Sequence, residues 1–163
     1  MSDVDVVDAL TDLTSFLKGE TVSGSEYVSQ VQNWFSDEND QQSFALRLVI
    51  HYAGDVHQPL HATSEVDHDF PEGDVGGNSQ HLPYIDGVGN LHAVWDSVLY
   101  EYCGYPDLPL DSDNWDSITD AAASMNKSHP VASKDILSGK FEEWAQQSLD
   151  ISSTVVYPGF VFN

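Results

Sequence analysis

One segment in the first half of the chain places two polar side chains on the apolar side of a helix. The residues in question are Phe44, Leu48, His51 and Asp55. Their intervals of four, three and four positions put side chains on one face of an α-helix. Asp40 is a suitable N-cap for this helix, and Pro59 marks its far end. We therefore expect a helix over about residues 40–57 that directs an imidazole and a carboxylate inward.

The rest of the chain also favours helices. Apolar residues recur at helical spacing in five further segments, namely residues 4–17, 27–35, 91–102, 112–127 and 134–156. Residues 62–90 differ, because they contain two prolines and five glycines and show no sustained period. We predict a mainly α fold with a long irregular loop, which in a compact domain is more often functional than idle.

Composition bounds the class of protein. A chain of 163 residues with 40% hydrophobic content can bury one core, which predicts a single domain over residues 1–163. No apolar run is long enough to predict a membrane span, and the N-terminal residues show no signal peptide. The lone Cys103 cannot form an intramolecular disulfide. The net charge of −22 argues against a basic surface for nucleic acid.

Two His–Asp pairs suggest a metal site. His51 and Asp55 lie four residues apart on the predicted helix, so both can bind one metal ion. His92 and Asp96 repeat this spacing. His61 follows Pro59, where a bend in the backbone can bring its imidazole to a neighbouring helix. The set of His61, His92 and Asp96 leaves one coordination position open for water, as in catalytic zinc sites.

The simpler interpretation of one helical His–Asp pair is a hydrogen-bonded couple without a metal. Two such pairs together with His61 favour the metal site instead. His57 lies on another side of the helix and is interpreted as a structural or supporting residue. The other three histidines have no helical partner and are interpreted as ordinary surface or loop residues: His68, His81 and His129.

Three motifs carry a family resemblance. They are LRLVIHYAGDVHQPLH at residues 46–61, GGN at 76–78 and NLHAVWD at 90–96. Their order and spacing closely resemble the zinc-dependent single-strand nucleases and 3′-nucleotidases, also called type I or S-one/P-one nucleases. A looser likeness extends from VVDAL at residues 6–10 to WAQQSLD at residues 144–150.

The resemblance implies a trinuclear zinc cluster in the helical fold that bacterial zinc phospholipases C share. Matched by motif, His61, His92 and Asp96 would hold one zinc ion. His51 and Asp55 would hold another, and Asp55 would also reach the third. The implied reaction is hydrolysis of phosphodiester bonds in single-stranded DNA and RNA by zinc-activated water, with 3′-nucleotidase activity as a further possibility.

The resemblance also implies a substrate contact and a compartment. Gly76 and Asn78 match the segment that contacts a nucleobase, where glycine allows close approach and the amide can read a base edge. Family members are secreted or reside in a lysosome-like space. They also begin with a tryptophan and further His and Asp ligands, which this sequence does not show before His51. We therefore expect a chain that is incomplete at both ends relative to the family, and no catalytic aspartate is assigned.

Other functions remain open from the residues alone. A zinc phospholipase C would keep the metals and change the substrate. A truncated, non-catalytic domain would bind metal for stability only. Calcium binding by the acidic residues at 67–74 is a weaker alternative, because their spacing lacks the glycine and terminal glutamate of an EF-hand loop.

Overall fold

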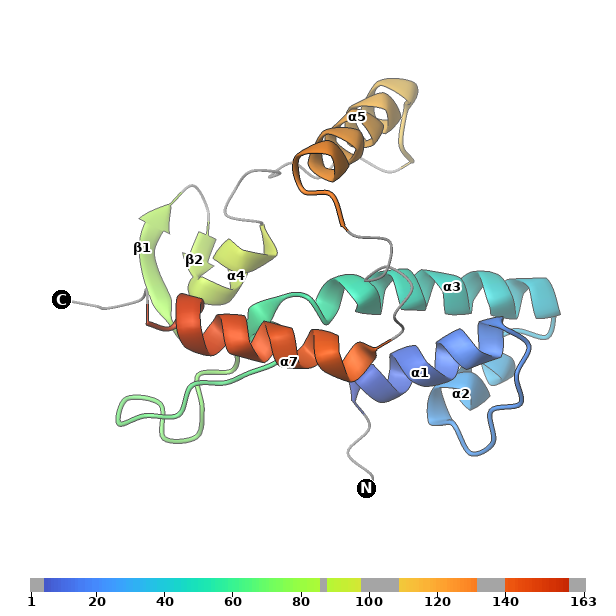
Figure 1. The fold of residues 1–163 in the computed structure, drawn as a ribbon, viewed down its shortest axis with the longest axis horizontal. Coiled ribbons are helices and arrows are strands. Elements are labelled where there is room, and N and C mark those ends of the chain that lie inside the picture. The colour runs from blue at the N-terminus through green and yellow to red at the C-terminus, as the bar shows by residue number, and fades with distance from the viewer. Residues whose placement is uncertain (1–4, 86–87, 98–108, 132–139, 159–163) are drawn as a thin grey trace. The chain divides into compact units, whose positions relative to one another are not determined.

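The computed structural model describes residues 5–85, 88–97, 109–131 and 140–158 (Figure 1). Contacts between residues group the chain into two units, one of residues 1–96 with 140–163 and one of residues 97–139. The single domain expected over residues 1–163 therefore stays a prediction. Among the described residues, no helix has the length and apolar character needed to cross a membrane.

The larger unit contains most of the helices. Its elements in chain order are α1 (Val6–Leu17), α2 (Glu26–Trp34), α3 (Glu38–Asp55), the 3₁₀ helix η1 (Pro59–His61), β1 (His81–Ile85), β2 (Val88–Asn90), α4 (Leu91–Asp96), α7 (Phe141–Ile151) and the π-helical turn η3 (Ser152–Val156). The mainly α fold predicted from the sequence is confirmed.

Side-chain oxygens begin the first three helices. Asp5 caps α1 and Ser25 caps α2, and each accepts hydrogen bonds from backbone N–H groups of the first turn. α3 is capped by Asp37, which accepts from the N–H groups of Asn39 and Asp40. The prediction of Asp40 as the cap is therefore wrong by three residues. Asp40 lies inside the first turn, where its negative charge still favours the helix N-terminus.

Three apolar clusters hold the larger unit together. Leu13, Val31 and Ala45 join α1, α2 and α3, and they are almost completely buried. Leu10, Val56 and Phe141 bring α7 onto α1 and the end of α3. A third cluster joins η1, α4 and η3 through Leu60, Leu91 and Val156. Figure 1 shows the beginning of α7 beside the beginning of α1, where the second cluster lies. α7 also contacts η1, and η1 in turn contacts α4.

The predicted long loop over residues 62–90 is only partly irregular. Residues 62–80 lack helices and strands, but β1 and β2 form an antiparallel hairpin in which His81 pairs with Asn90 and Ile85 with Val88. His81 accordingly lies on a strand, and its side chain is exposed.

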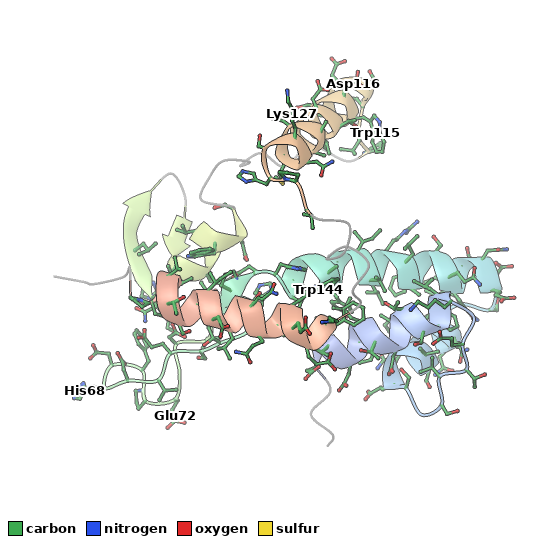
Figure 2. The ribbon with its side chains drawn as sticks, viewed as in Figure 1. His68, Glu72, Trp115, Asp116, Lys127 and Trp144 are labelled. Atoms are coloured by element: carbon green, nitrogen blue, oxygen red, sulfur yellow. The ribbon has the colours of Figure 1, made fainter. Side chains whose placement is uncertain are left out.

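The later helices are partly as predicted. α4 ends at Asp96, and the rest of the predicted helix, residues 98–102, lies outside the described residues. α7 covers part of the predicted 134–156 segment, continues into the turn η3, and residues 134–139 are again outside the described part. The smaller unit contains α5 (Ser112–Ser128), capped by Asp111. Trp115, labelled in Figure 2, is an exposed side chain of α5.

Candidate metal centre

The five predicted metal ligands come together from three elements of the larger unit. His51 and Asp55 lie in the last two turns of α3, His61 ends η1, and His92 and Asp96 lie on α4. His51 Nε2 is 3.2 Å from Asp55 Oδ2, and His61 Nδ1 is 3.7 Å from Asp55 Oδ1. The two His–Asp pairs are thus connected through the imidazole of His61.

The second pair and His61 form the tightest cluster. Nε2 of His61 and Nε2 of His92 are 3.3 Å apart. Asp96 completes the group, with Oδ1 3.6 Å from His61 Nε2 and Oδ2 3.4 Å from His92 Nε2. His61, His92 and Asp96 therefore form a group that could hold a metal ion.

These separations fit the size of a zinc site. Zinc bonds of about 2.0–2.1 Å in a tetrahedral arrangement place neighbouring ligand atoms roughly 3.3–3.4 Å apart. The three observed distances of 3.3, 3.4 and 3.6 Å lie at or slightly above this edge length. The last two distances end on different oxygens of Asp96, and one ligand atom from each of the three residues lies within 4.8 Å of the others. Two imidazoles and a carboxylate are donors that zinc accepts, so the donor set fits zinc in chemistry and approximately in size.

The ring of His92 is oriented by the backbone. Its Nδ1 is 2.7 Å from the carbonyl oxygen of Gly76, which can only accept a hydrogen bond. Nδ1 must therefore carry the proton, and in the neutral ring the lone pair of Nε2 faces His61 and Asp96. A backbone carbonyl that fixes the tautomer in this way is typical of metal-binding histidines.

The cluster is less buried than the sequence suggests. The exposed fraction of the side chain is 18% for His92 and 31% for His61, and it rises to 67% for His51. His51 and Asp55 continue the helix face that carries Phe44 and Leu48, but the end of this face is open. The expectation that both side chains point into an interior is therefore wrong for His51.

A cavity of about 620 Å³ adjoins the cluster at Asp55 and His61. The helices α1, α2, α3 and α7 contribute to its walls, which include Tyr27 and Tyr52. Its remaining lining is largely aliphatic, with Asp5 and Glu142 as further acidic residues. A largely apolar space therefore adjoins the candidate metal centre.

The remaining histidines lie where the sequence suggested. His57 contacts the carbonyl oxygen of Ala53 through Nδ1, and its ring packs on Trp144 of α7 with centroids 4.9 Å apart. Trp144 is labelled in Figure 2. The same figure shows His68 on the irregular loop, pointing away from the helices. The side chains of His68 and His129 are exposed.

The glycine-rich turn contacts the cluster in a way that the sequence did not predict. Gly76 is buried with a φ of +60°, and its carbonyl oxygen is the partner of His92. A Cβ added at Gly76 would lie 2.4 Å from the carbonyl oxygen of Leu60. Asn78 is exposed, and its side-chain amide donates to the carbonyl oxygen of Val75. The contact of Gly76 and Asn78 with a nucleobase stays a prediction.

Asp74, one of the acidic residues considered for calcium, is a buried carboxylate, which the sequence did not predict. It accepts hydrogen bonds from the Tyr157 hydroxyl, the Ser64 hydroxyl and the Glu65 N–H. Burial raises the pKa of Asp74, but hydrogen bonds from the Gly77 backbone and from these groups outweigh burial, so the pKa is lowered overall. Burial and then the bond to Asp74 raise the pKa of Tyr157. Asp74 thereby ties the glycine-rich turn to the end of the chain's last described helix.

The fold and the site together define a mainly helical protein with a His–His–Asp cluster suited to a metal ion. A sequence profile described as S1/P1 Nuclease matches residues 14–162. The chain belongs to the S1/P1 nuclease family.

Individual relatives match shorter segments. Endonuclease 2 of Arabidopsis thaliana is 32% identical over 90 residues, which cover 52% of this chain and 29% of the relative. Nuclease S1 of Aspergillus oryzae is 33% identical over 79 residues, or 45% of this chain and 25% of the relative. Phospholipase C of Bacillus cereus is 28% identical over 86 residues, or 52% and 29%.

The chain thus spans less than a third of the length of each of these three relatives. No solved structure matches it significantly.

Proposed function

We propose that the protein is a zinc-dependent endonuclease that hydrolyses phosphodiester bonds in single-stranded DNA and RNA. The observation that carries this proposal is the convergence of His61, His92 and Asp96, whose ligand atoms lie within 4.8 Å of one another, in a member of the S1/P1 nuclease family. A 3′-nucleotidase activity and a secreted or lysosome-like location belong to the same proposal and derive from the family resemblance.

The five side chains have distinct roles in this proposal. His61, His92 and Asp96 hold one zinc ion. His51 and Asp55 would contribute to a second, and the family resemblance implies that Asp55 would also reach a third. The two oxygens of Asp55 face His51 and His61. Zinc held there would activate water for attack on phosphorus and neutralise charge on the phosphate. The protein's own contribution is to keep two carboxylates and three imidazoles at short distances around the reacting phosphate.

The net negative charge of the chain favours a substrate that is bound at the metal centre and not along an extended surface. With 27 acidic and 5 basic residues, a long basic groove for a duplex is excluded by composition. Local positive charge at a metal centre can bind one phosphate despite an acidic surface. A single strand also exposes its bases, so one base can enter a site beside the cleaved phosphate. Gly76 and Asn78 are the proposed contacts of that base.

The turn that carries Asn78 can present its side chain to a base. Asn78 is exposed, and its amide uses one N–H for the carbonyl oxygen of Val75. An amide group has a second N–H and a carbonyl oxygen, which match the donor and acceptor pattern of a base edge. Because Gly76 lies two residues away and its carbonyl contacts His92, such a base would lie close to the metal centre.

Cleavage assays with a ligand variant test the proposal. The zinc-loaded wild-type protein, His92→Ala and the control His68→Ala are incubated with denatured DNA and with RNA. We expect His92→Ala to lose more than the roughly 10–100-fold that removal of a supporting group costs. His68→Ala should cleave like the wild type because His68 is exposed on the loop. Equal cleavage by His92→Ala and the wild type would contradict the proposal.

A zinc phospholipase C is the second candidate. The aliphatic cavity next to Asp55 and His61 could accept an acyl chain, and Bacillus cereus phospholipase C is among the relatives. Phosphatidylcholine micelles are therefore included as a third substrate in the same assay. Cleavage of the lipid without cleavage of DNA or RNA would favour this candidate. A protein that binds zinc and cleaves none of the three would be a non-catalytic metal-binding domain.

A further inference from the structure

The amide of Gln58 connects two elements that carry proposed zinc ligands. Its Oε1 accepts a hydrogen bond from the backbone N–H of Leu60 at 2.6 Å. Its Nε2 donates to Asp96 Oδ1 at 2.9 Å. This orientation of the amide is chemically required, because an N–H can only donate and an ionised carboxylate can only accept. A flipped amide would lose both hydrogen bonds.

The first contact acts on His61. Gln58 is the N-cap of η1, and its side chain satisfies the N–H of Leu60 in a helix of only three residues. Pro59 follows it and restricts the backbone at this point. The position of His61, the last residue of η1, therefore depends on how Gln58 begins that turn. Leu60 is buried, which keeps the turn attached to the apolar cluster below it.

The second contact acts on Asp96. The carboxylate of Asp96 is 47% exposed and lies at the end of the short helix α4. The bond from Gln58 holds Oδ1, and Oδ2 lies 3.4 Å from His92 Nε2. An amide donor is neutral, so it restricts the rotation of the carboxylate without neutralising the charge that a cation requires.

We propose that Gln58 is a positioning residue that holds His61 and Asp96 at zinc-binding distance before the metal binds. This inference rests on the proposed function. His92 is oriented independently by the carbonyl oxygen of Gly76. Gln58 thus holds the carboxylate of Asp96 directly and the backbone of His61 through the turn η1 that it caps. The site is then preorganised, and the metal does not have to order its own ligands.

Substitution of Gln58 by glutamate separates its two contacts. Gln58→Glu keeps an oxygen for the N–H of Leu60 but replaces the donor to Asp96 by a second carboxylate. Gln30→Glu is the matched control, because the amide of Gln30 also donates to a carboxylate, that of Glu26, on α2. The dissociation constant for Zn²⁺ is measured on the folded protein by competition with a chromophoric chelator. The absorption spectrum with Co²⁺ reports the coordination geometry.

We expect Gln58→Glu to bind Zn²⁺ roughly 10–100-fold more weakly than the wild type and to change the Co²⁺ spectrum. Gln30→Glu should leave both unchanged. Gln58→Met, which has similar volume and no added charge, should also weaken binding because it lacks the donor. If Gln58→Met binds like the wild type, the effect of glutamate is only its charge, and the inference is overturned. Wild-type affinity in both Gln58 variants overturns it too.

The same titration distinguishes this inference from the proposed function. His92→Ala is included as the variant that removes a ligand. If His92→Ala loses Zn²⁺ binding but the Gln58 variants do not, the inference fails and the proposed function stands. If the wild type does not bind Zn²⁺, both fail. Unfolding midpoints of the metal-free variants, measured in urea, show whether weaker binding occurs in a protein that is still folded.

Discussion

Gly76 combines a left-handed backbone conformation with a close contact. An alanine in this conformation costs about 1–2 kcal/mol for the backbone alone, and a Cβ at Gly76 would also lie 2.4 Å from the carbonyl oxygen of Leu60. Gly24 has a similar φ of +79° and no atom within 4 Å of such a Cβ. We expect Gly76→Ala to lower the free energy of unfolding by about 1–3 kcal/mol more than Gly24→Ala does.

Urea unfolding of the metal-free proteins measures this difference. Gly24→Ala is the control for backbone strain alone. Equal destabilisation by the two substitutions would show that the turn moves away from Leu60 without cost.

A single residue, Asp74, makes the free energy of unfolding depend on pH. Its pKa is lowered in the folded protein, by hydrogen bonds that outweigh burial. The stabilisation from the ionised carboxylate is therefore present above the unfolded pKa of about 4 and is lost as pH falls through the lower folded pKa. We expect Asp74→Asn to lower the free energy of unfolding by about 1–3 kcal/mol at neutral pH, because the groups that donate hydrogen bonds to Asp74 lose one acceptor oxygen.

The pH dependence of this stability difference shows how much of it comes from the negative charge of Asp74. The difference between the wild type and Asp74→Asn should shrink as pH falls below about 4. Denaturant titrations at neutral and acidic pH measure it. Burial, followed by the charges of Asp67 and Asp74, raises the pKa of Glu65, so Glu65 acts with the opposite sign. A difference that stays constant over this range would mean that folding does not shift the pKa of Asp74.

At the scale of elements, one buried hydrogen bond joins α7 to the end of α3. Ser148 Oγ donates to the carbonyl oxygen of Val56 at 2.6 Å, and both residues are buried. Val56 is the C-cap of α3 and directly follows Asp55. Ser148→Ala leaves this carbonyl oxygen without its donor, which we expect to cost about 1–3 kcal/mol of unfolding free energy.

Ser153→Ala is the matched control for this prediction. The hydroxyl of Ser153 also donates to a backbone carbonyl oxygen, that of Asp150, but the pair is local and exposed. We expect an effect within about 0.5 kcal/mol for this control. Thermal unfolding of both variants checks the comparison, and similar midpoints would argue against a role of Ser148 in joining the helices.

At the scale of the whole molecule, the net charge of −22 dominates. Like charges repel one another in the compact folded state, and salt screens them over about 10 Å at 0.1 M. We expect the free energy of unfolding of the metal-free protein to rise between about 20 mM and about 500 mM sodium chloride. Urea midpoints measured at both concentrations test this, with potassium chloride as a control for specific ion effects. A midpoint that does not change would show that the charges are already too far apart to matter.

The helices were predictable because their signals are local. Apolar spacing located α1, α2, α3 and α5 to within a few residues. The errors have local causes as well. Asp37 and Asp40 are equally good caps by residue type, and only the backbone path decides between them. The hairpin of β1 and β2 was missed because a short strand with Pro83 shows no clear alternation.

The helices and the two His–Asp pairs can be predicted from local spacing, since side chains four residues apart come together on any α-helix. That His61 joins both pairs, that Gln58 reaches Asp96 and that His51 is exposed follow from how the helices pack. These contacts join segments more than thirty residues apart or depend on which helix covers which face. The distances between these side chains follow from how the apolar clusters pack. The periodicity along a single helix contains no information about that packing.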